Sequence, residues 1–202
     1  QCERSCQRKC ERLSLQRRGG TVIRKLRYIT GRLGNAQGGL SVHLSTLSPD
    51  FDALAIDAGF LQQSFEEQVN STRKFCDIGE GFIIANSYGA YLLLQSLVDQ
   101  PPLATSVMLL SPVLGRAMDS ERMLFSRPPR EKTLRNAIAT KRIGMPSHLE
   151  IVTGKEDEVC DWQLASKCAN ELGIQISLLL GEGHMISPAN VTEAVSLFLA
   201  NR

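Results

Sequence analysis

A serine at position 87 lies in a sequence pattern that could hold it as a nucleophile. The apolar run from Gly81 to Asn86 precedes Ser87, and a second apolar run of helical character follows it. This pattern is typical of a strand that turns sharply into a helix, with small residues, here Ala85 and Gly89, letting the two backbones pass closely. Such a turn would lift the serine hydroxyl above the sheet edge, facing the first N–H groups of the helix. A serine that only caps a buried helix would show the same pattern, so this motif leaves both interpretations open.

An acid and a histidine follow Ser87 in the chain order Ser, acid, His. Asp157 lies in an acidic loop after the β-type run 148–153, and His184 lies in a glycine-containing loop after the β-type run 174–180. Because parallel strands bring their carboxyl ends to one edge of a sheet, these side chains can meet there. A histidine oriented by a carboxylate can take the proton of a serine hydroxyl, so the set indicates nucleophilic catalysis. A solvated histidine loop and a solvated acidic turn are the alternative interpretation.

Four acidic residues crowd the loop that would supply the carboxylate: Glu156, Asp157, Glu158 and Asp161. We prefer Asp157 because it lies three residues past Gly154, the glycine that ends the strand. Asp161 is then left to cap the helix that follows.

The elements that must position these residues alternate along the chain. Six apolar segments are expected to form strands, and most segments between them have helical patterns. Continuous apolar strands separated by helices predict an α/β fold with a mostly parallel six-stranded sheet and helices on both faces. The expected strands are 22–29, 52–57, 81–86, 106–111, 148–153 and 174–180, and the expected helices are 36–47, 61–76, 88–98, 161–172 and 188–200.

The motifs resemble those of the α/β-hydrolase superfamily, and within it the small, compact serine esterases of about two hundred residues. The similarity spans roughly residues 21–202, which we take as the hydrolase domain. The segments that carry it are 85–89, 154–157 and 181–184. Ala85 stands where the family usually has glycine, and Thr30 stands where the loop after the first core strand usually has histidine.

This resemblance implies a serine hydrolase that cleaves a carboxylic ester or a related acyl bond. Ser87, His184 and Asp157 would form the catalytic triad and act through an acyl-enzyme. The resemblance assigns the oxyanion hole to the backbone N–H groups of Arg32 and Tyr88. It implies no metal and no organic cofactor.

The segment 115–146 departs from the alternation of strands and helices. It lies after the strand next to the Ser87 strand, where insertions in this fold type tend to cover the site, and its eight Lys/Arg against three acids give a net charge of +5. We expect a small helical cap, with Met118, Met123 and Phe125 lining an acyl pocket. An ordinary helical connection with a basic, solvated face explains the pattern equally well.

Length and composition predict one soluble domain. The 202 residues are 43% hydrophobic and 22% charged, enough to bury a full sheet core. No apolar run approaches the roughly eighteen residues of a membrane helix, and the first residues lack a signal-peptide pattern. We therefore expect a cytoplasmic protein with a small-molecule acyl substrate. Its oligomeric state and the identity of the substrate stay open.

Residues 1–20 are expected to form a basic N-terminal arm or helix. Residues 1–27 carry nine Lys/Arg and two Glu without aromatic residues among them. A solvated helix or frayed terminus is therefore preferred, and no nucleic-acid partner is expected. Cys2, Cys6 and Cys10 would form one stripe on a helix, but their spacing matches no common metal-ligand pattern, so packing of the thiols is preferred to a metal site.

Two other classes of function remain open. A non-catalytic binding protein could keep this fold with an idle Ser87, and the altered loop at Thr30 favours that alternative. A protein that binds nucleic acid or another charged surface could act through residues 1–20 instead.

Overall fold

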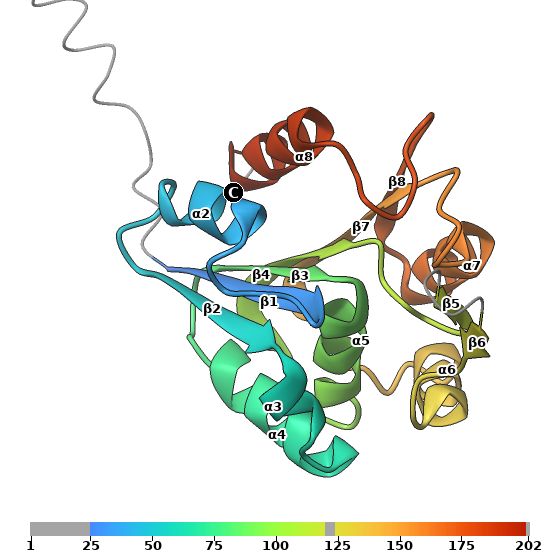
Figure 1. Cartoon of the computed structure of the whole chain (residues 1–202). Coiled ribbons are helices and arrows are strands. Elements are labelled where there is room, and N and C mark those ends of the chain that lie inside the picture. Colours follow the sequence, from blue (N-terminus) through green and yellow to red (C-terminus); the bar gives the residue numbers. More distant parts are fainter. Residues whose placement is uncertain (1–24, 120–123, 201–202) are drawn as a thin grey trace, which may run out of the picture.

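Six parallel strands form the central sheet of this computed structural model, which describes residues 25–119 and 124–200 (Figure 1). The strand order is β2-β1-β3-β4-β7-β8, and each neighbouring pair runs parallel. The bounds are β1 Leu26–Arg32, β2 Phe51–Ile56, β3 Phe82–Asn86, β4 Leu103–Leu110, β7 Pro146–Gly154 and β8 Gln175–Leu179. The predicted mostly parallel six-stranded sheet is confirmed.

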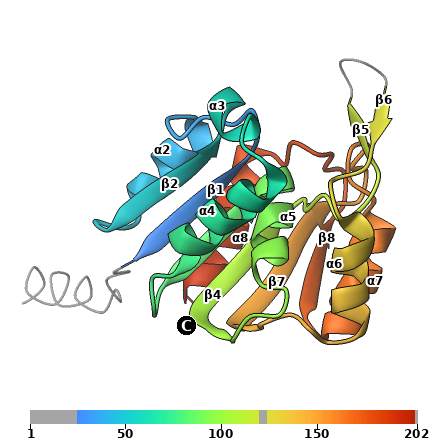
Figure 2. The ribbon, with the colours of Figure 1, turned by 90° about the horizontal axis from the view of Figure 1, so that it is seen from below.

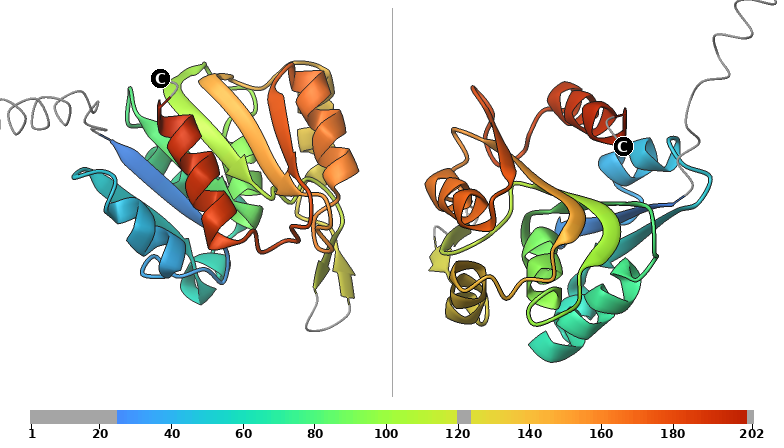
Figure 3. Two further views of the ribbon diagram at one scale, coloured as in Figure 1. Left: turned by 90° about the horizontal axis from the view of Figure 1, so that it is seen from above. Right: turned by 180° about the vertical axis from the view of Figure 1, so that it is seen from behind.

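Helices cover both faces of this sheet, as predicted. In the described part of the chain, two helices lie across one face, which Figure 3 shows from above: α2 Gly39–Ser45 and α8 Pro188–Ala200. Five helices pack against the other face: α3 Ala58–Leu61, α4 Phe65–Cys76, α5 Ser87–Ser96, α6 Glu131–Ala139 and α7 Trp162–Leu172. Among the described residues, no helix is long and apolar enough to cross a membrane.

The strand before Ser87 shows why the central strands read as continuous apolar runs. Ile83 and Ala85 are buried against the α5 side of the sheet, whereas Ile84 is buried against the α2 and α8 side. Successive side chains of a strand point to opposite faces, so a strand covered on both faces needs apolar residues at every position. The helix α5 is itself buried along nearly its whole length, which explains why it lacks a polar face.

The helix expected over 61–76 is instead two helices, and this is a correction to the predicted boundaries. A short helix α3 ends at Leu61, and α4 begins after Ser64. The Ser64 side chain accepts a hydrogen bond from the Glu67 backbone N–H, and the Glu67 carboxylate accepts one from the Ser64 backbone N–H. This reciprocal cap starts a new helix and therefore interrupts the longer one.

The segment 115–146, expected as a helical cap, has a different structure. Its described part contains an antiparallel ribbon of β5 Ala117–Asp119 and β6 Leu124–Ser126, followed by a single helix, α6. Figure 2 shows this ribbon projecting beyond the α/β core. Pro128 and Pro129 precede α6, and proline in a helix interior removes a hydrogen bond, so helical structure begins only after them. The predicted basic arm, 1–20, lies outside the described residues.

Candidate active site

Ser87 lies at the junction of β3 and α5, where the backbone takes a left-handed turn. Its φ is +52°, a conformation that is uncommon for a residue with a side chain. Gly89 makes this turn compatible with close packing: a Cβ there would lie 2.2 Å from the carbonyl oxygen of Thr30 and 2.7 Å from Cγ2 of Ile29. The helix therefore approaches β1 closely only because residue 89 has no side chain. The Ser87 residue is 8% exposed at this junction.

His184 lies in the loop between β8 and α8, which is attached to the end of β7. The Glu156 N–H donates a 3.0 Å hydrogen bond to the carbonyl oxygen of Glu182. A Cβ at Gly154 would lie 2.1 Å from that same oxygen, so the strand end and the loop are in direct contact. The Glu182 carboxylate in turn accepts hydrogen bonds from the Ser187 N–H and hydroxyl, at 2.7 and 2.6 Å. The loop is therefore anchored on both sides of the histidine.

The structure brings Ser87, His184 and Asp157 together in one hydrogen-bonded chain. Ser87 Oγ lies 3.1 Å from His184 Nε2, and His184 Nδ1 lies 3.1 Å from Asp157 Oδ2. An ionised carboxylate only accepts hydrogen bonds, so the proton of the neutral imidazole belongs on Nδ1. Nε2 then presents a lone pair to the serine hydroxyl. This arrangement can remove the proton of Ser87.

The Asp157 side chain is fully buried, with 0% exposure. Its Oδ1 accepts hydrogen bonds from the backbone N–H groups of Val159 (2.9 Å) and Cys160 (2.7 Å). Burial by itself would raise the pKa of Asp157, but the hydrogen bonds from His184 and from these N–H groups, with the charge of a protonated His184, outweigh it and lower the pKa. Asp157 is therefore held as a carboxylate beside the imidazole.

The neighbouring acids have other contacts. Asp161 accepts hydrogen bonds from the backbone N–H groups of Gln163 and Leu164, which confirms that it caps α7. The Glu158 carboxylate lies 3.4 Å from the backbone N–H of His184. Of the crowded acids, Asp157 is the one whose carboxylate reaches the imidazole.

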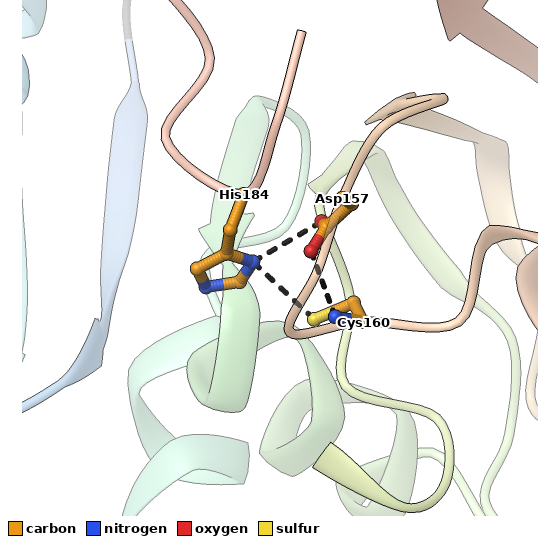
Figure 4. Close-up of side chains that lie close together, drawn as sticks. All are labelled: Asp157, Cys160 and His184. Carbon is orange, nitrogen blue, oxygen red and sulfur yellow. Dashed lines mark hydrogen bonds and ion pairs between the residues drawn. The ribbon is translucent and has the colours of Figure 1, made fainter. Parts of the chain in front are cut away.

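Cys160 is a neighbour of this site that sequence reasoning missed. Its Sγ lies 3.4 Å from His184 Nδ1 (Figure 4). The same Sγ donates to the carbonyl oxygen of Ser111 at 3.2 Å. Burial, with the nearby charges of Asp157 and Glu158, raises the pKa of this thiol well above its ordinary value. The signal that could have found it is its position three residues after Asp157, a spacing at which an aspartate turn folds the chain back on itself.

Asp157, Cys160 and His184 also form a group that could hold a metal ion. Each offers one ligand atom, and these atoms lie within 4.8 Å of one another.

The two residues assigned to the oxyanion hole lie at the ends of neighbouring elements. Arg32 is the last residue of β1, and Tyr88 is the second residue of α5, whose first N–H groups have no acceptor within the helix. The Tyr88 side chain points elsewhere: its hydroxyl donates to Gln68 at 3.2 Å and its ring stacks on Tyr91 at 5.9 Å. The Tyr88 side chain is therefore held by Gln68 and Tyr91, and its backbone N–H is the group assigned to the oxyanion hole.

Of the expected acyl-pocket residues, Met118 lies in β5 and Phe125 lies in β6. Met118 pairs with Phe125 across the ribbon, and its N–H donates to the carbonyl oxygen of Val159 at 3.4 Å. The ribbon therefore touches the loop that carries Asp157. Met123 lies outside the described residues. A hollow of about 460 Å³ is instead lined by residues at the carboxyl ends of β1 and β2: Leu33, Gly34, Asn35, Ala36, Gln37, Ala55 and Asp57.

Comparison with solved structures identifies the fold as that of the α/β hydrolases. The chain is similar to α/β hydrolase domain-containing protein 10 from mouse, with a TM-score of 0.63 and 13% identity over 86% of this chain and 87% of that one. It is similar to Est1E from Butyrivibrio proteoclasticus, with a TM-score of 0.61 and 13% identity over 91% and 90% of the two chains. It is also similar to a structure from Nitrososphaera gargenis described in a study of carboxylesterases, with a TM-score of 0.59 and 14% identity over 88% and 90%.

No family model and no curated protein sequence matches the chain. The similarity to these solved structures therefore lies in the arrangement of the sheet and helices.

Proposed function

We propose that this protein is a serine hydrolase that cleaves a carboxylic ester or a related acyl bond of a small molecule. The observation that carries the proposal is the continuous set of contacts from Ser87 Oγ through His184 to Asp157, with both distances at 3.1 Å. The hydrolase fold of the chain and the carboxylesterases among proteins of similar structure support it.

In the first half of the reaction, His184 Nε2 accepts the proton of Ser87 while Oγ attacks the acyl carbonyl carbon. Asp157 holds the imidazole in the required tautomer and stabilises the imidazolium that forms. Negative charge develops on the carbonyl oxygen, and the N–H groups of Arg32 and Tyr88 donate hydrogen bonds to it. The imidazolium then protonates the leaving group, which departs and leaves the acyl group on Ser87.

In the second half, water takes the place of the leaving group. His184 removes a proton from the water, which attacks the acyl-enzyme, and Ser87 is released with its proton restored. The protein groups named here supply every proton transfer in this sequence.

The surroundings of the site favour a substrate with an apolar part. Leu33 follows Arg32 and is 67% exposed, and Met185 follows His184 and is 84% exposed. Covering large apolar side chains at such exposure with a ligand is favourable, because it removes apolar surface from water. The hollow that includes Leu33 is the candidate space for an acyl or alcohol group.

The proposal is tested with an active-serine probe. The wild-type chain, Ser87→Ala and His184→Ala are incubated with a fluorophosphonate probe, and turnover of p-nitrophenyl acetate and butyrate is measured in parallel. We expect the wild type to label and to hydrolyse at least one ester. Both variants should lose labelling and turnover by about a thousandfold or more, because the three residues act as one unit.

Matched controls are available within the same chain. Ser45→Ala removes an exposed serine of α2, and His148→Ala removes a histidine from the amino-terminal half of β7. Both should keep labelling and turnover. A folded wild type that neither labels nor hydrolyses either ester contradicts the proposal and supports the alternative, a binding protein in which Ser87 is idle.

A further inference from the structure

The thiol of Cys160 is a buried group with metal-binding chemistry that the proposed hydrolysis does not use. It lies beside the imidazole on the Asp157 side, so Nδ1 of His184 has two neighbours, a carboxylate oxygen at 3.1 Å and a sulfur at 3.4 Å (Figure 4). Thiolate, imidazole and carboxylate are the three side-chain ligands that zinc takes in proteins. Magnesium and calcium prefer oxygen ligands, so this set selects for a softer cation.

The distances between these ligand atoms suit a tetrahedral zinc ion. Zinc bonds of about 2.3 Å to sulfur and about 2.0–2.1 Å to nitrogen and oxygen place tetrahedral ligands about 3.5 Å apart for N and S, and about 3.4 Å apart for N and O. The observed separations from His184 Nδ1 are 3.4 Å to Cys160 Sγ and 3.1 Å to Asp157 Oδ2. The two separations from the imidazole nitrogen are therefore close to those of a tetrahedral zinc site, and the sulfur and the carboxylate oxygen lie within 4.8 Å of each other.

We propose that Asp157, Cys160 and His184 form an inhibitory binding site for Zn²⁺. The metal ion forms bonds to the Cys160 sulfur, to His184 Nδ1 and to the Asp157 carboxylate, and the fourth position is left for water. The thiol proton is released to solvent. The Nδ1 proton of the imidazole moves to Nε2, because a neutral imidazole that binds a metal through one nitrogen carries its proton on the other.

The inhibitory effect follows from that tautomer. The inhibition, unlike the metal binding itself, rests on the proposed function. With a proton on Nε2, His184 can only donate to Ser87 and can no longer accept its proton. Asp157 at the same time exchanges its hydrogen bond with the imidazole for a bond to the metal. Zinc would therefore remove the general base without blocking the substrate pocket.

Metal binding is measured directly, so the test does not depend on activity. The full chain carries Cys2→Ser, Cys6→Ser and Cys10→Ser, so that N-terminal thiols cannot bind the metal. Zn²⁺ affinity is measured by competition with a chromophoric chelator, and Co²⁺ is used as a spectroscopic probe. We expect one metal ion per chain and a thiolate-to-cobalt charge-transfer absorption band. Adding Cys160→Ala should abolish the band and weaken zinc binding by about tenfold or more.

Cys168→Ala is the matched control, because Cys168 is also a buried free thiol. This variant should keep both the cobalt band and the zinc affinity. The proposal is overturned if the background chain shows no thiolate band, or if Cys160→Ala binds zinc as tightly as the background.

Inhibition by zinc is measured as the ratio of ester turnover with and without Zn²⁺ in each variant. Zinc should lower turnover in the background chain and in Cys168→Ala, and a chelator should restore it. A chain that binds zinc but hydrolyses no ester contradicts only the proposed function. A chain that hydrolyses esters with equal rates with and without bound zinc contradicts the inhibitory site.

Discussion

The hydroxyl of Thr30 donates a 3.1 Å hydrogen bond to the carbonyl oxygen of Gly31, the residue that lies beside Ser87 in space. That carbonyl also accepts from the Gly34 N–H at 2.9 Å. The Gly31 carbonyl and the Arg32 N–H belong to one planar trans peptide and point in opposite directions. Two hydrogen bonds to the carbonyl therefore fix the direction of the N–H that we assign to the oxyanion hole. We therefore propose that the buried Thr30 hydroxyl positions this peptide.

Replacing Thr30 by valine should lower kcat by about tenfold with a smaller change in KM, because a misdirected Arg32 N–H weakens binding of the developing oxyanion. The Thr30 hydroxyl also accepts from the buried Ile56 N–H at 2.8 Å. Loss of this hydroxyl leaves the buried N–H without its acceptor and should therefore cost about 1–3 kcal/mol of stability. Steady-state kinetics and urea unfolding measure the two effects. Thr30→Ser keeps the hydroxyl and should recover most of kcat; if it is as slow as Thr30→Val, the hydroxyl has no positioning role.

The left-handed backbone at Ser87 should store conformational strain. Glycine adopts a φ of +52° without steric cost, whereas alanine does not. We therefore expect Ser87→Gly to be more stable than Ser87→Ala by about 1 kcal/mol, although both variants lose the contact to His184. Thermal unfolding should show this as a Tm difference of about 2–4 °C. Equal stability of the two variants would show that the turn is relaxed.

Gly89→Ala should disturb both the fold and the site. The added Cβ would meet the backbone oxygen of Thr30 at 2.2 Å, so α5 must move away from β1. A loss of about 2 kcal/mol or more is expected in urea unfolding, together with reduced ester turnover. Gly39→Ala is the control, because its added Cβ would meet no atom from outside its chain neighbours and its own helix within 4 Å, and alanine favours helix α2. This control should leave stability within about 1 kcal/mol of the wild type.

The cap of α4 should make stability depend on pH. Hydrogen bonds from the Ser64 side chain and backbone lower the pKa of Glu67 below its ordinary value. A carboxyl group whose pKa is lower in the folded state stabilises the fold above its unfolded pKa, and this contribution is lost as pH falls through the folded pKa. Glu67→Gln should therefore be less stable than the wild type at pH 7 and indistinguishable from it near pH 2. A stability difference that is the same at both pH values would contradict this linkage.

The fold could be predicted well from the sequence because its signals are local and repeated. Continuous apolar runs such as 81–86 and 106–111 predict strands buried on both faces, and every one of the six expected strands is present in the sheet. Boundaries were less accurate where a short cap decided them, as at Ser64. The segment 115–146 could not be predicted, because a ribbon of three-residue strands has too few residues to show a periodic pattern.

The amino-acid sequence predicts which residue types reach the carboxyl edge of the sheet and in which chain order they do so. Strand ends can be predicted in this way because they follow from the local hydrophobic pattern and from turn chemistry. The position of Asp157 after Gly154 already favoured it over the acids beside it, and its contact with the imidazole agrees with that prediction. Only the tertiary structure decided that Cys160 joins the two residues there. It also decided that the Thr30 hydroxyl binds the Gly31 carbonyl. The contacts of His184 with Asp157 and Cys160 depend on shifts of an ångström between backbones far apart in sequence, and no local pattern encodes distances of that kind.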